Sequence, residues 1–256
     1  MPSLPPAALP AAFLTTPIAH RGLHGSGIAE NSLAAAQAAM DAGYAIELDI
    51  QPARDGTPLV FHDYDLSRLT GGQGLVRGFD PDALSARRLL GTDHPIPTLR
   101  RFLDLVADRV PLLIEIKDQD MRLGPDIGHL HKAVADALHG YDGAVAVMSF
   151  NPHMVAAFHA LAPNVPVGLT TCAFDEKDWS GIPEETRSRL AGINDFDQSG
   201  ACFISHDKKD LSNPRVDALK AQGVPILCWT VRSSEEEALA RRVADNITVE
   251  GYRPAF

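Results

Sequence analysis

The sequence predicts an α/β fold, a TIM (β/α)8 barrel with a hairpin or lid insertion after its second strand. Two observations predict it: eight short apolar runs of strand character alternate with helical patterns, and 256 residues are the usual size of such a barrel. A doubly wound open sheet is the main alternative, but no GxGxxG motif follows an early strand to favour it. Active sites of TIM barrels lie at the C-terminal ends of the strands, so polar residues there are the functional candidates.

The strand-like and helical segments alternate along most of the chain. Strands are expected at residues 18–20, 44–50, 111–117, 144–149, 166–169, 201–205, 225–230 and 246–250. Helices are expected at residues 32–42, 98–107, 127–138, 153–161, 183–190, 214–222 and 233–243. Asn31-Ser32 and Ser233-Ser234 are typical of helix starts, and Gly43 and Gly223 stand where helices are expected to stop.

One long segment, residues 51–97, interrupts this alternation. It opens with Asp55-Gly56, a strong signal for a two-residue hairpin turn. If these two residues form the turn, paired residues have numbers that sum to 111, so Asp49 faces His62. A shift by one residue would turn His62 to the other face. The rest of the insertion is interpreted as a small lid over the barrel mouth.

Composition and charge exclude several classes of protein. The net charge is -10 and the pI is near 5.4, so the chain lacks the clustered Lys and Arg of a nucleic-acid-binding surface. No run approaches the roughly 18 apolar residues of a membrane helix. Residues 1–16, rich in Ala and Pro, make a poor signal peptide and are expected to form an extended arm. Three cysteines without CxxC spacing indicate buried free thiols, and we expect a cytoplasmic protein of open oligomeric state.

Carboxylates gather at the ends of the second and third expected strands. Glu47 and Asp49 are two residues apart, so they share one side of a strand, and Glu115 and Lys117 share a side by the same rule. Three converging carboxylates repel one another, and a divalent cation removes that conflict. Oxygen ligands favour Mg²⁺ or Ca²⁺ over zinc.

Two histidines and an arginine complete the group. His20 and Arg21 end the first strand, and the hairpin returns His62 to the same place. Taken singly, each has a structural interpretation: a rim histidine, a surface cation, or a partner of an acidic neighbour. Together they supply an acid, a base, a cation cage and an anion clamp, which are the groups that phosphodiester cleavage needs.

Eight motifs in chain order resemble the signature of the glycerophosphodiester phosphodiesterase family. They are His20-Arg21-Gly22, Glu30-Asn31-Ser32, Glu47-Leu48-Asp49, His62-Asp63, Ile96-Pro97-Thr98-Leu99, Glu115-Ile116-Lys117, Ser149-Phe150 and Trp229-Thr230-Val231. The resemblance runs from about residue 17 to 254, and each motif is weak alone. It implies one phosphodiesterase domain at residues 17–256, a TIM barrel whose hairpin insertion follows the second strand.

The resemblance also implies roles for nine side chains. His20 and His62 would be the general acid–base pair. Glu47, Asp49 and Glu115 would hold one divalent cation, Mg²⁺ or Ca²⁺. The groups expected to bind substrate are Arg21 and Lys117 at the phosphate and Trp229 at the glycerol carbons, with Phe150 either beside Trp229 or in the core.

Some residues depart from the family pattern. The last strand ends in Thr248-Val249-Glu250-Gly251 instead of a Thr-Asp-Pro-like turn, so Glu250 is left out of the site. His206, within Ser205-His206-Asp207, belongs either to a structural loop or to a contact with the substrate alcohol. No chemistry is expected from the remaining histidines, which are His24, His94, His129, His131, His139, His153 and His159.

Three functions compete on this sequence. The leading hypothesis is metal-dependent hydrolysis of a small glycerophosphodiester to glycerol 3-phosphate and an alcohol. The second keeps the site but acts on lysophospholipids or other phosphodiesters, as a phospholipase D does; the chain shows no basic amphipathic segment for membrane contact. The third is a non-catalytic barrel that binds phosphodiesters. The head-group, the choice of Mg²⁺ or Ca²⁺, and attack by water or by the substrate's own hydroxyl stay open.

Overall fold

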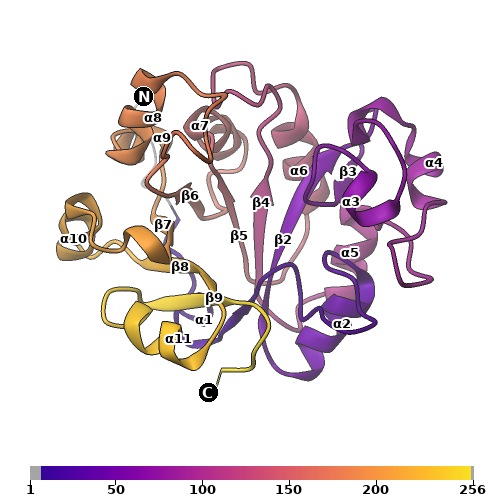
Figure 1. Cartoon of the computed structure of the whole chain (residues 1–256), viewed down its shortest axis with the longest axis horizontal. Helices are drawn as coiled ribbons and strands as arrows, with labels where there is room; N and C mark the ends of the chain where they lie inside the picture. Colours follow the sequence, from indigo (N-terminus) through magenta and orange to yellow (C-terminus); the bar gives the residue numbers. More distant parts are fainter. Residues whose placement is uncertain (1–6, 255–256) are drawn as a thin grey trace.

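The computed structural model describes residues 7–254, and its centre is a closed barrel of eight parallel strands (Figure 1). In barrel order the strands are β1 (Ile18–Ala19), β2 (Ala45–Pro52), β4 (Leu112–Ile116), β5 (Val145–Ser149), β6 (Val167–Thr171), β7 (Phe203–Asp207), β8 (Ile226–Val231) and β9 (Asn246–Val249). The barrel closes because β1 pairs with both β2 and β9. This closure confirms the TIM barrel and excludes the open doubly wound sheet.

Helices surround the barrel where the sequence predicts them. They are α2 (Leu33–Asp41), α5 (Leu99–Val106), α6 (Leu130–Leu138), α7 (Pro152–Leu161), α8 (Glu184–Ala191), α10 (Pro214–Ala221) and α11 (Ser234–Ala240). Both predicted helix starts are capped, because the Ser32 and Ser233 hydroxyls accept bonds from the backbone N–H groups of Ala35 and Glu236. Short helical turns add α9 (Phe196–Ser199) and the 3₁₀ turn η2 (Lys208–Asp210). Within residues 7–254, no helix has both the length and the apolar character that crossing a membrane requires.

Alternation along the strands separates two cores. In β2, Ile46 and Leu48 belong to the larger core shared with the surrounding helices, whereas Ala45 faces the barrel interior. The inward positions that follow Ala45 are Glu47 and Asp49, which line a cavity at the barrel mouth. The interior is therefore apolar at its base and charged at its mouth.

The N-terminal segment differs from the expected extended arm. Residues 1–6 lie outside the described residues, but α1 (Ala12–Thr15) is helical. Leu9 and Phe13, four residues apart, pack with Ile18, Ala45 and other side chains at the base of the barrel. Burial of these two apolar side chains favours a helical turn over an extended chain, so this segment closes the bottom of the barrel.

The hairpin register is one residue away from the expected one. In the antiparallel pair of β2 with β3 (Pro58–Val60), Ile50 pairs with Val60, so the numbers sum to 110 and Asp49 does not pair with His62. The reason is a three-residue loop: the Ala53 N–H bonds the Thr57 carbonyl, and Gly56 takes a positive φ of 90°. His62 lies beyond the end of β3 and still lines the cavity.

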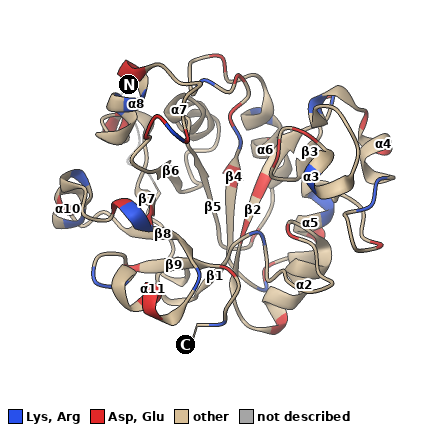
Figure 2. Cartoon of the chain, in the orientation of Figure 1, with Lys and Arg blue, Asp and Glu red and all other residues tan. Residues whose placement is uncertain are grey.

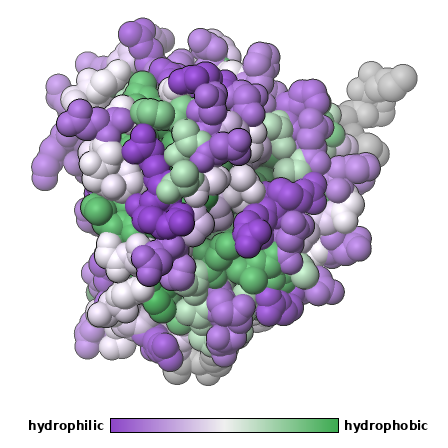
Figure 3. All heavy atoms as spheres, turned by 90° about the vertical axis from the view of Figure 1, so that its right-hand side faces the viewer, coloured by the Kyte–Doolittle hydropathy of each residue, from purple (hydrophilic) through white to green (hydrophobic). Residues whose placement is uncertain are grey.

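The rest of the insertion forms its own small core. Leu59, Phe61, Leu66 and Leu84 are fully buried there, among α3 (Ser67–Thr70), the 3₁₀ turn η1 (Val76–Gly78) and α4 (Pro81–Ser85). Hydrophilic side chains cover most of the outer face on this side of the molecule, with apolar patches between them (Figure 3). Several residues of the insertion border the cavity, whereas its closure as a lid stays a prediction.

Candidate active site

A cavity of about 730 Å³ opens at the C-terminal ends of the strands. Its wall includes all nine side chains singled out from the sequence: His20, Arg21, Glu47, Asp49, His62, Glu115, Lys117, Phe150 and Trp229. Acidic residues are visible on β2 and β4 in the middle of the barrel (Figure 2). The fold therefore brings these distant stretches of the chain to one place.

Three carboxylates form the floor of one side of the cavity. Asp49 and Glu115 are partners in the β2–β4 register, and Glu47 lies two residues earlier on the same side of β2. Each offers an oxygen within 4.8 Å of the others, and all three are buried. Burial and the charges of Asp49 and Glu115 raise the pKa of Glu47 well above its ordinary value. A buried carboxylate set that resists full ionisation fits a hard divalent cation with oxygen ligands.

Lys117 lies inside this acidic group. Its Nζ is 2.6 Å from the Asp49 Oδ1 and also pairs with Glu115. Burial alone would lower the pKa of Lys117, but the charges of Asp49 and Glu115 raise it. Burial would raise the pKa of Asp49, but Lys117, His62 and Arg21 hold it well below its usual range. Lys117 thus supplies part of the positive charge that the carboxylates need.

Each of the two expected catalytic histidines meets a carboxylate through Nδ1. The His20 Nδ1 is 2.8 Å from the Glu250 Oε2, and its Nε2 lies 4.0 Å from the Glu47 Oε2. The His62 Nδ1 is 2.6 Å from the Asp63 Oδ1. Burial lowers the pKa of His20, which favours a neutral ring. A carboxylate at Nδ1 favours the tautomer whose Nε2 lone pair is free to accept a proton.

Arg21 connects the acidic group to a chain of ion pairs. Its backbone N–H donates to the Glu47 Oε2 at 2.9 Å, in a left-handed turn with a φ of 56°. Its guanidinium bonds Glu30 at 2.7 Å and lies 3.4 Å from Asp49. Arg68 then joins Glu30 to Asp63, the carboxylate beside His62. These linked ion pairs hold the side of the cavity that contains the acidic group in place from several directions.

Aromatic side chains form the other side of the cavity. The Phe150 ring lies 5.1 Å from Trp179 and 5.6 Å from Trp229, and Trp179 lies 4.9 Å from Phe174, measured between centroids. The Trp229 Nε1–H donates to the Ser205 carbonyl at 2.9 Å. These contacts hold the rings as a wall with apolar faces.

Comparison with known proteins identifies the family. Residues 20–247 match the model of the glycerophosphoryl diester phosphodiesterase family. The chain belongs to this family. A glycerophosphodiester phosphodiesterase of Caldanaerobacter subterraneus is 35% identical over 244 residues, which cover 91% of this chain and 93% of that protein. One of Bacillus subtilis is 27% identical, covering 86% of this chain and 77% of that protein.

Solved structures support the same fold. A phosphodiesterase of Oleispira antarctica, solved with the product sn-glycerol-3-phosphate, has a TM-score of 0.74 at 24% identity, covering 93% of this chain and 94% of that one. The glycerophosphodiester phosphodiesterase of Thermotoga maritima has a TM-score of 0.69 at 22% identity, covering 91% and 92%.

The sequence motifs of the phosphodiesterase family left several functional contacts unassigned. Asn31 is buried and donates from Nδ2 to the Asp49 Oδ2 at 2.8 Å, while its Oδ1 accepts the Asp49 N–H. Glu30 and Asp63 lie within two of the family motifs, but no role was predicted for them. Glu250 was left out of the site, although Thr248 and Glu250 are two apart and the alternation that grouped Glu47 with Asp49 could have found it. Trp179 lies in a loop and had no such signal.

His206 has a structural position in this phosphodiesterase. It is fully buried, with Nδ1 2.8 Å from the Thr171 hydroxyl and Nε2 3.0 Å from the Asp210 carbonyl. It is not among the residues that line the cavity, although its neighbours Asp207 and Lys208 are. The expected loop is therefore wrong, because His206 lies within β7, where its buried contacts are structural. The cavity wall gives no support to a contact between His206 and the substrate alcohol.

Proposed function

We propose that His20 and His62 are the acid–base pair of a metal-dependent hydrolysis in which a glycerophosphodiester yields glycerol 3-phosphate and an alcohol. The reaction is that of the family to which the chain belongs, and the proposed catalytic domain spans residues 17–256. One observation carries the assignment of roles: two carboxylate-bound imidazoles and a buried acidic trio border a single cavity.

Glu47, Asp49 and Glu115 are the proposed ligands of one divalent cation, Mg²⁺ or Ca²⁺. When bound, the cation polarises a phosphoryl oxygen and offsets the negative charge that develops on it. Its charge would satisfy the carboxylates that Lys117 now pairs with, so Lys117 becomes available to a phosphate oxygen. Arg21 offers a second positively charged side chain on the same side of the cavity. Its guanidinium pairs with Glu30 and lies beside Asp49.

The two imidazoles divide the proton transfers. One Nε2 takes the proton of the attacking oxygen, and the other ring, protonated, gives a proton to the leaving alkoxide. Glu250 and Asp63 hold the two rings through Nδ1 and stabilise whichever ring is charged. The attacking oxygen is either water or the neighbouring hydroxyl of the glycerol. The apolar faces of Trp229 and Phe150 then receive the carbon skeleton of the substrate.

The proposal is tested with enzyme stripped by EDTA and supplied again with single cations. We expect glycerol 3-phosphate release from glycerophosphocholine to vanish after stripping and to return with Mg²⁺ or Ca²⁺. Glu115→Gln should not recover at ordinary cation concentrations, because it removes a ligand charge. Glu185→Gln, on the exposed surface of α8, is the matched control and should recover like the unmodified chain. Full activity without any cation would contradict the assignment.

The same assay separates the alternatives. Water-soluble glycerophosphodiesters should react faster than long-chain lysophosphatidylcholine. Preference for the lysophospholipid would favour the phospholipase D-like activity. Binding of glycerophosphodiesters without cation-dependent turnover would favour the non-catalytic barrel.

A further inference from the structure

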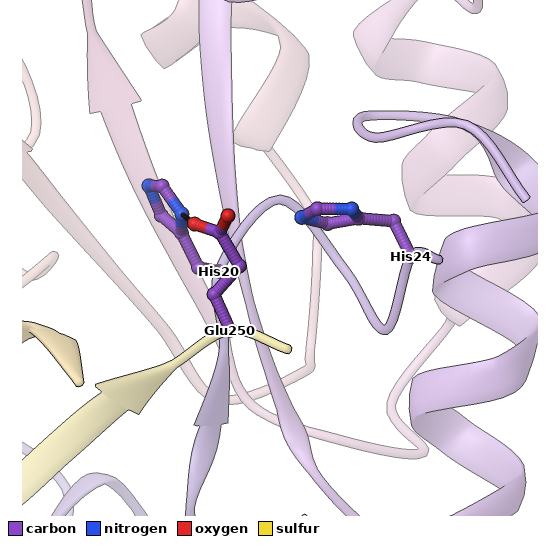
Figure 4. Close-up of side chains that lie close together, drawn as sticks. All are labelled: His20, His24 and Glu250. Carbon is purple, nitrogen blue, oxygen red and sulfur yellow. Dashed lines mark hydrogen bonds and ion pairs between the residues drawn. The ribbon is translucent and has the colours of Figure 1, made fainter. Parts of the chain in front are cut away.

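A second group of potential metal ligands lies on the other side of His20. His20, His24 and Glu250 each offer a ligand atom, and these atoms lie within 4.8 Å of one another. In Figure 4 the Glu250 carboxylate lies between the two imidazole rings, and one nitrogen of the His24 ring points toward it. His20 and His24 are four residues apart, a spacing visible in the sequence, yet His24 was expected to carry no chemistry.

The backbone holds these three residues in place. The His20 N–H bonds the Val249 carbonyl, which aligns the end of β1 with the end of β9, where Glu250 follows. The turn to His24 is fixed because the Leu23 N–H bonds the Ala35 carbonyl on α2. Gly22 permits that turn: its φ is 77°, and a Cβ there would lie 2.8 Å from the Ala35 Cβ.

His24 and Glu250 each have an atom that is available to bind a metal ion. The His24 Nε2 is buried and has no hydrogen-bond partner among the described residues. The Glu250 Oε2 accepts from both His20 and Arg232, at 2.8 and 2.9 Å. Its second oxygen lies on the side of His24 in Figure 4, so a cation can bind it while Arg232 keeps its contact.

The ligand chemistry selects the metal. Two imidazoles and one carboxylate suit zinc, whereas Mg²⁺ and Ca²⁺ take oxygen ligands. Tetrahedral zinc with bonds of about 2.0 Å separates its ligand atoms by about 3.3 Å. The ligand atoms of His20, His24 and Glu250 already lie within 4.8 Å of one another, so modest side-chain movements bring them to that distance.

We propose that His20, His24 and Glu250 form an inhibitory zinc site. The proposal rests on the proposed role of His20. In the neutral ring, Nδ1 carries the proton that faces Glu250, and Nε2 holds a lone pair. Zinc at Nδ1 would require the other tautomer, in which the proton has moved from Nδ1 to Nε2. The Nε2 atom could then no longer accept a proton from the attacking oxygen. The His20 Nε2 faces Glu47 at 4.0 Å while its Nδ1 faces Glu250, so the imidazole ring lies between Glu250 and the acidic trio, and the proposed zinc ligands would not include a carboxylate of that trio.

Zinc titration of the full-length enzyme with Mg²⁺ saturating the acidic trio tests the site. Calorimetry should show one zinc bound to the unmodified chain, and activity should fall with the same midpoint. Loss of a residue that merely orients a ligand weakens metal binding by about 10–100-fold, so His24→Ala should weaken zinc by at least about 100-fold. Its activity in Mg²⁺ alone should match the unmodified chain.

His139→Ala is the matched control, because His139 is exposed at the end of α6, and it should bind zinc like the unmodified chain. Equal zinc inhibition of all three proteins would overturn the proposal, since zinc would then act at the acidic trio. Absence of calorimetric zinc binding to the unmodified chain would overturn it too. Zinc binding that needs His24, in a protein without glycerophosphodiester turnover, would instead refute the proposed function and retain the site. His24→Gln serves in place of His24→Ala if the latter unfolds early on heating.

Discussion

The two sides of the cavity are built in different ways. The ionic side, formed at the ends of β1, β2 and β4, is held by ion pairs and hydrogen bonds between charged groups, and Asp49 alone meets Lys117, Arg21 and Asn31. The aromatic side, which Phe150, Trp179 and Trp229 form, is held mainly by contacts between the rings, and a hydrogen bond from Trp229 to the Ser205 carbonyl anchors it. Hydrogen bonds and ion pairs depend steeply on distance and angle, whereas apolar contact depends mainly on area.

This difference separates two tasks. The ionic side must place a cation, a phosphate and two proton carriers relative to one another, so small displacements should reduce the rate of the chemical step. The aromatic side only excludes water and receives carbon, so substitutions there should change substrate affinity more than turnover. Substitutions on the two sides of the cavity should therefore differ in whether they reduce kcat or raise KM.

The largest effect is expected from the imidazoles on the ionic side. His62→Ala and His20→Ala should each reduce kcat by about 100- to 10,000-fold, the usual contribution of a general acid or base. Glycerol 3-phosphate release under saturating cation measures it. His153→Ala, on the exposed surface of α7, should retain activity. Near-normal turnover by either active-site variant, with unchanged thermal unfolding, would make the acid–base assignment wrong.

A smaller effect is expected from Asn31, which orients Asp49. Asn31→Gly removes the amide and keeps the left-handed φ of 54° that this position requires. Cation affinity should fall by about 10–100-fold, the usual cost of losing a residue that orients a metal ligand.

The concentration of Mg²⁺ that gives half-maximal activity measures this change. Excess Mg²⁺ should restore most of the rate, because the three carboxylates remain. Asn164→Gly, in an exposed loop, should leave the cation dependence unchanged. An unaltered dependence in Asn31→Gly would show that Asp49 is positioned by the strand alone.

On the aromatic side, Trp229→Leu should raise KM about tenfold with little change in kcat, which corresponds to about 1.4 kcal/mol of substrate binding. The indole is a large apolar face in the cavity wall, and its loss leaves the ionic side unchanged. Steady-state kinetics on glycerophosphocholine separates the two parameters. Leu161→Ala, exposed at the end of α7, is the control. A fall in kcat comparable to that of His62→Ala would contradict the division between the two sides.

Much of the fold was predictable because each strand and helix carries a local signal. Eight apolar runs and their helices, together with the Ser32 and Ser233 caps, were expected within a few residues of their observed bounds. The period of two along β2 and β4 placed Glu47, Asp49 and Glu115 on the inner face, which the structure shows.

The errors arose where tertiary contacts outweigh local patterns. Asp55-Gly56 signals a two-residue turn, but the loop has three residues, so the register moved by one. The arm that was expected to be extended folds because Leu9 and Phe13 fill the base of the barrel, which composition alone does not reveal. Glu250 and His24 were passed over because their importance depends on the neighbouring strand and turn, not on their own motifs.

The smallest effect concerns the stability of the fold. Its dependence on pH should differ between substitutions on the ionic side and on the aromatic side of the cavity. Burial would raise the pKa of Asp63, but hydrogen bonds from His62 and Arg68 lower it well below its ordinary value of 3.8. Because the folded-state pKa is the lower one, this carboxylate stabilises the fold above about pH 4, the unfolded value, and the contribution is lost as the pH falls toward the folded value.

Asp63→Asn should therefore lower the urea midpoint at pH 6 and flatten its decline toward pH 2. Asp136→Asn, in the exposed pair with Lys132, should follow the unmodified chain. Trp229→Leu should shift the midpoint equally at every pH, because no titrating group is lost. Parallel curves for Asp63→Asn and the unmodified chain would show that the ion pairs around His62 position the ring without stabilising the fold.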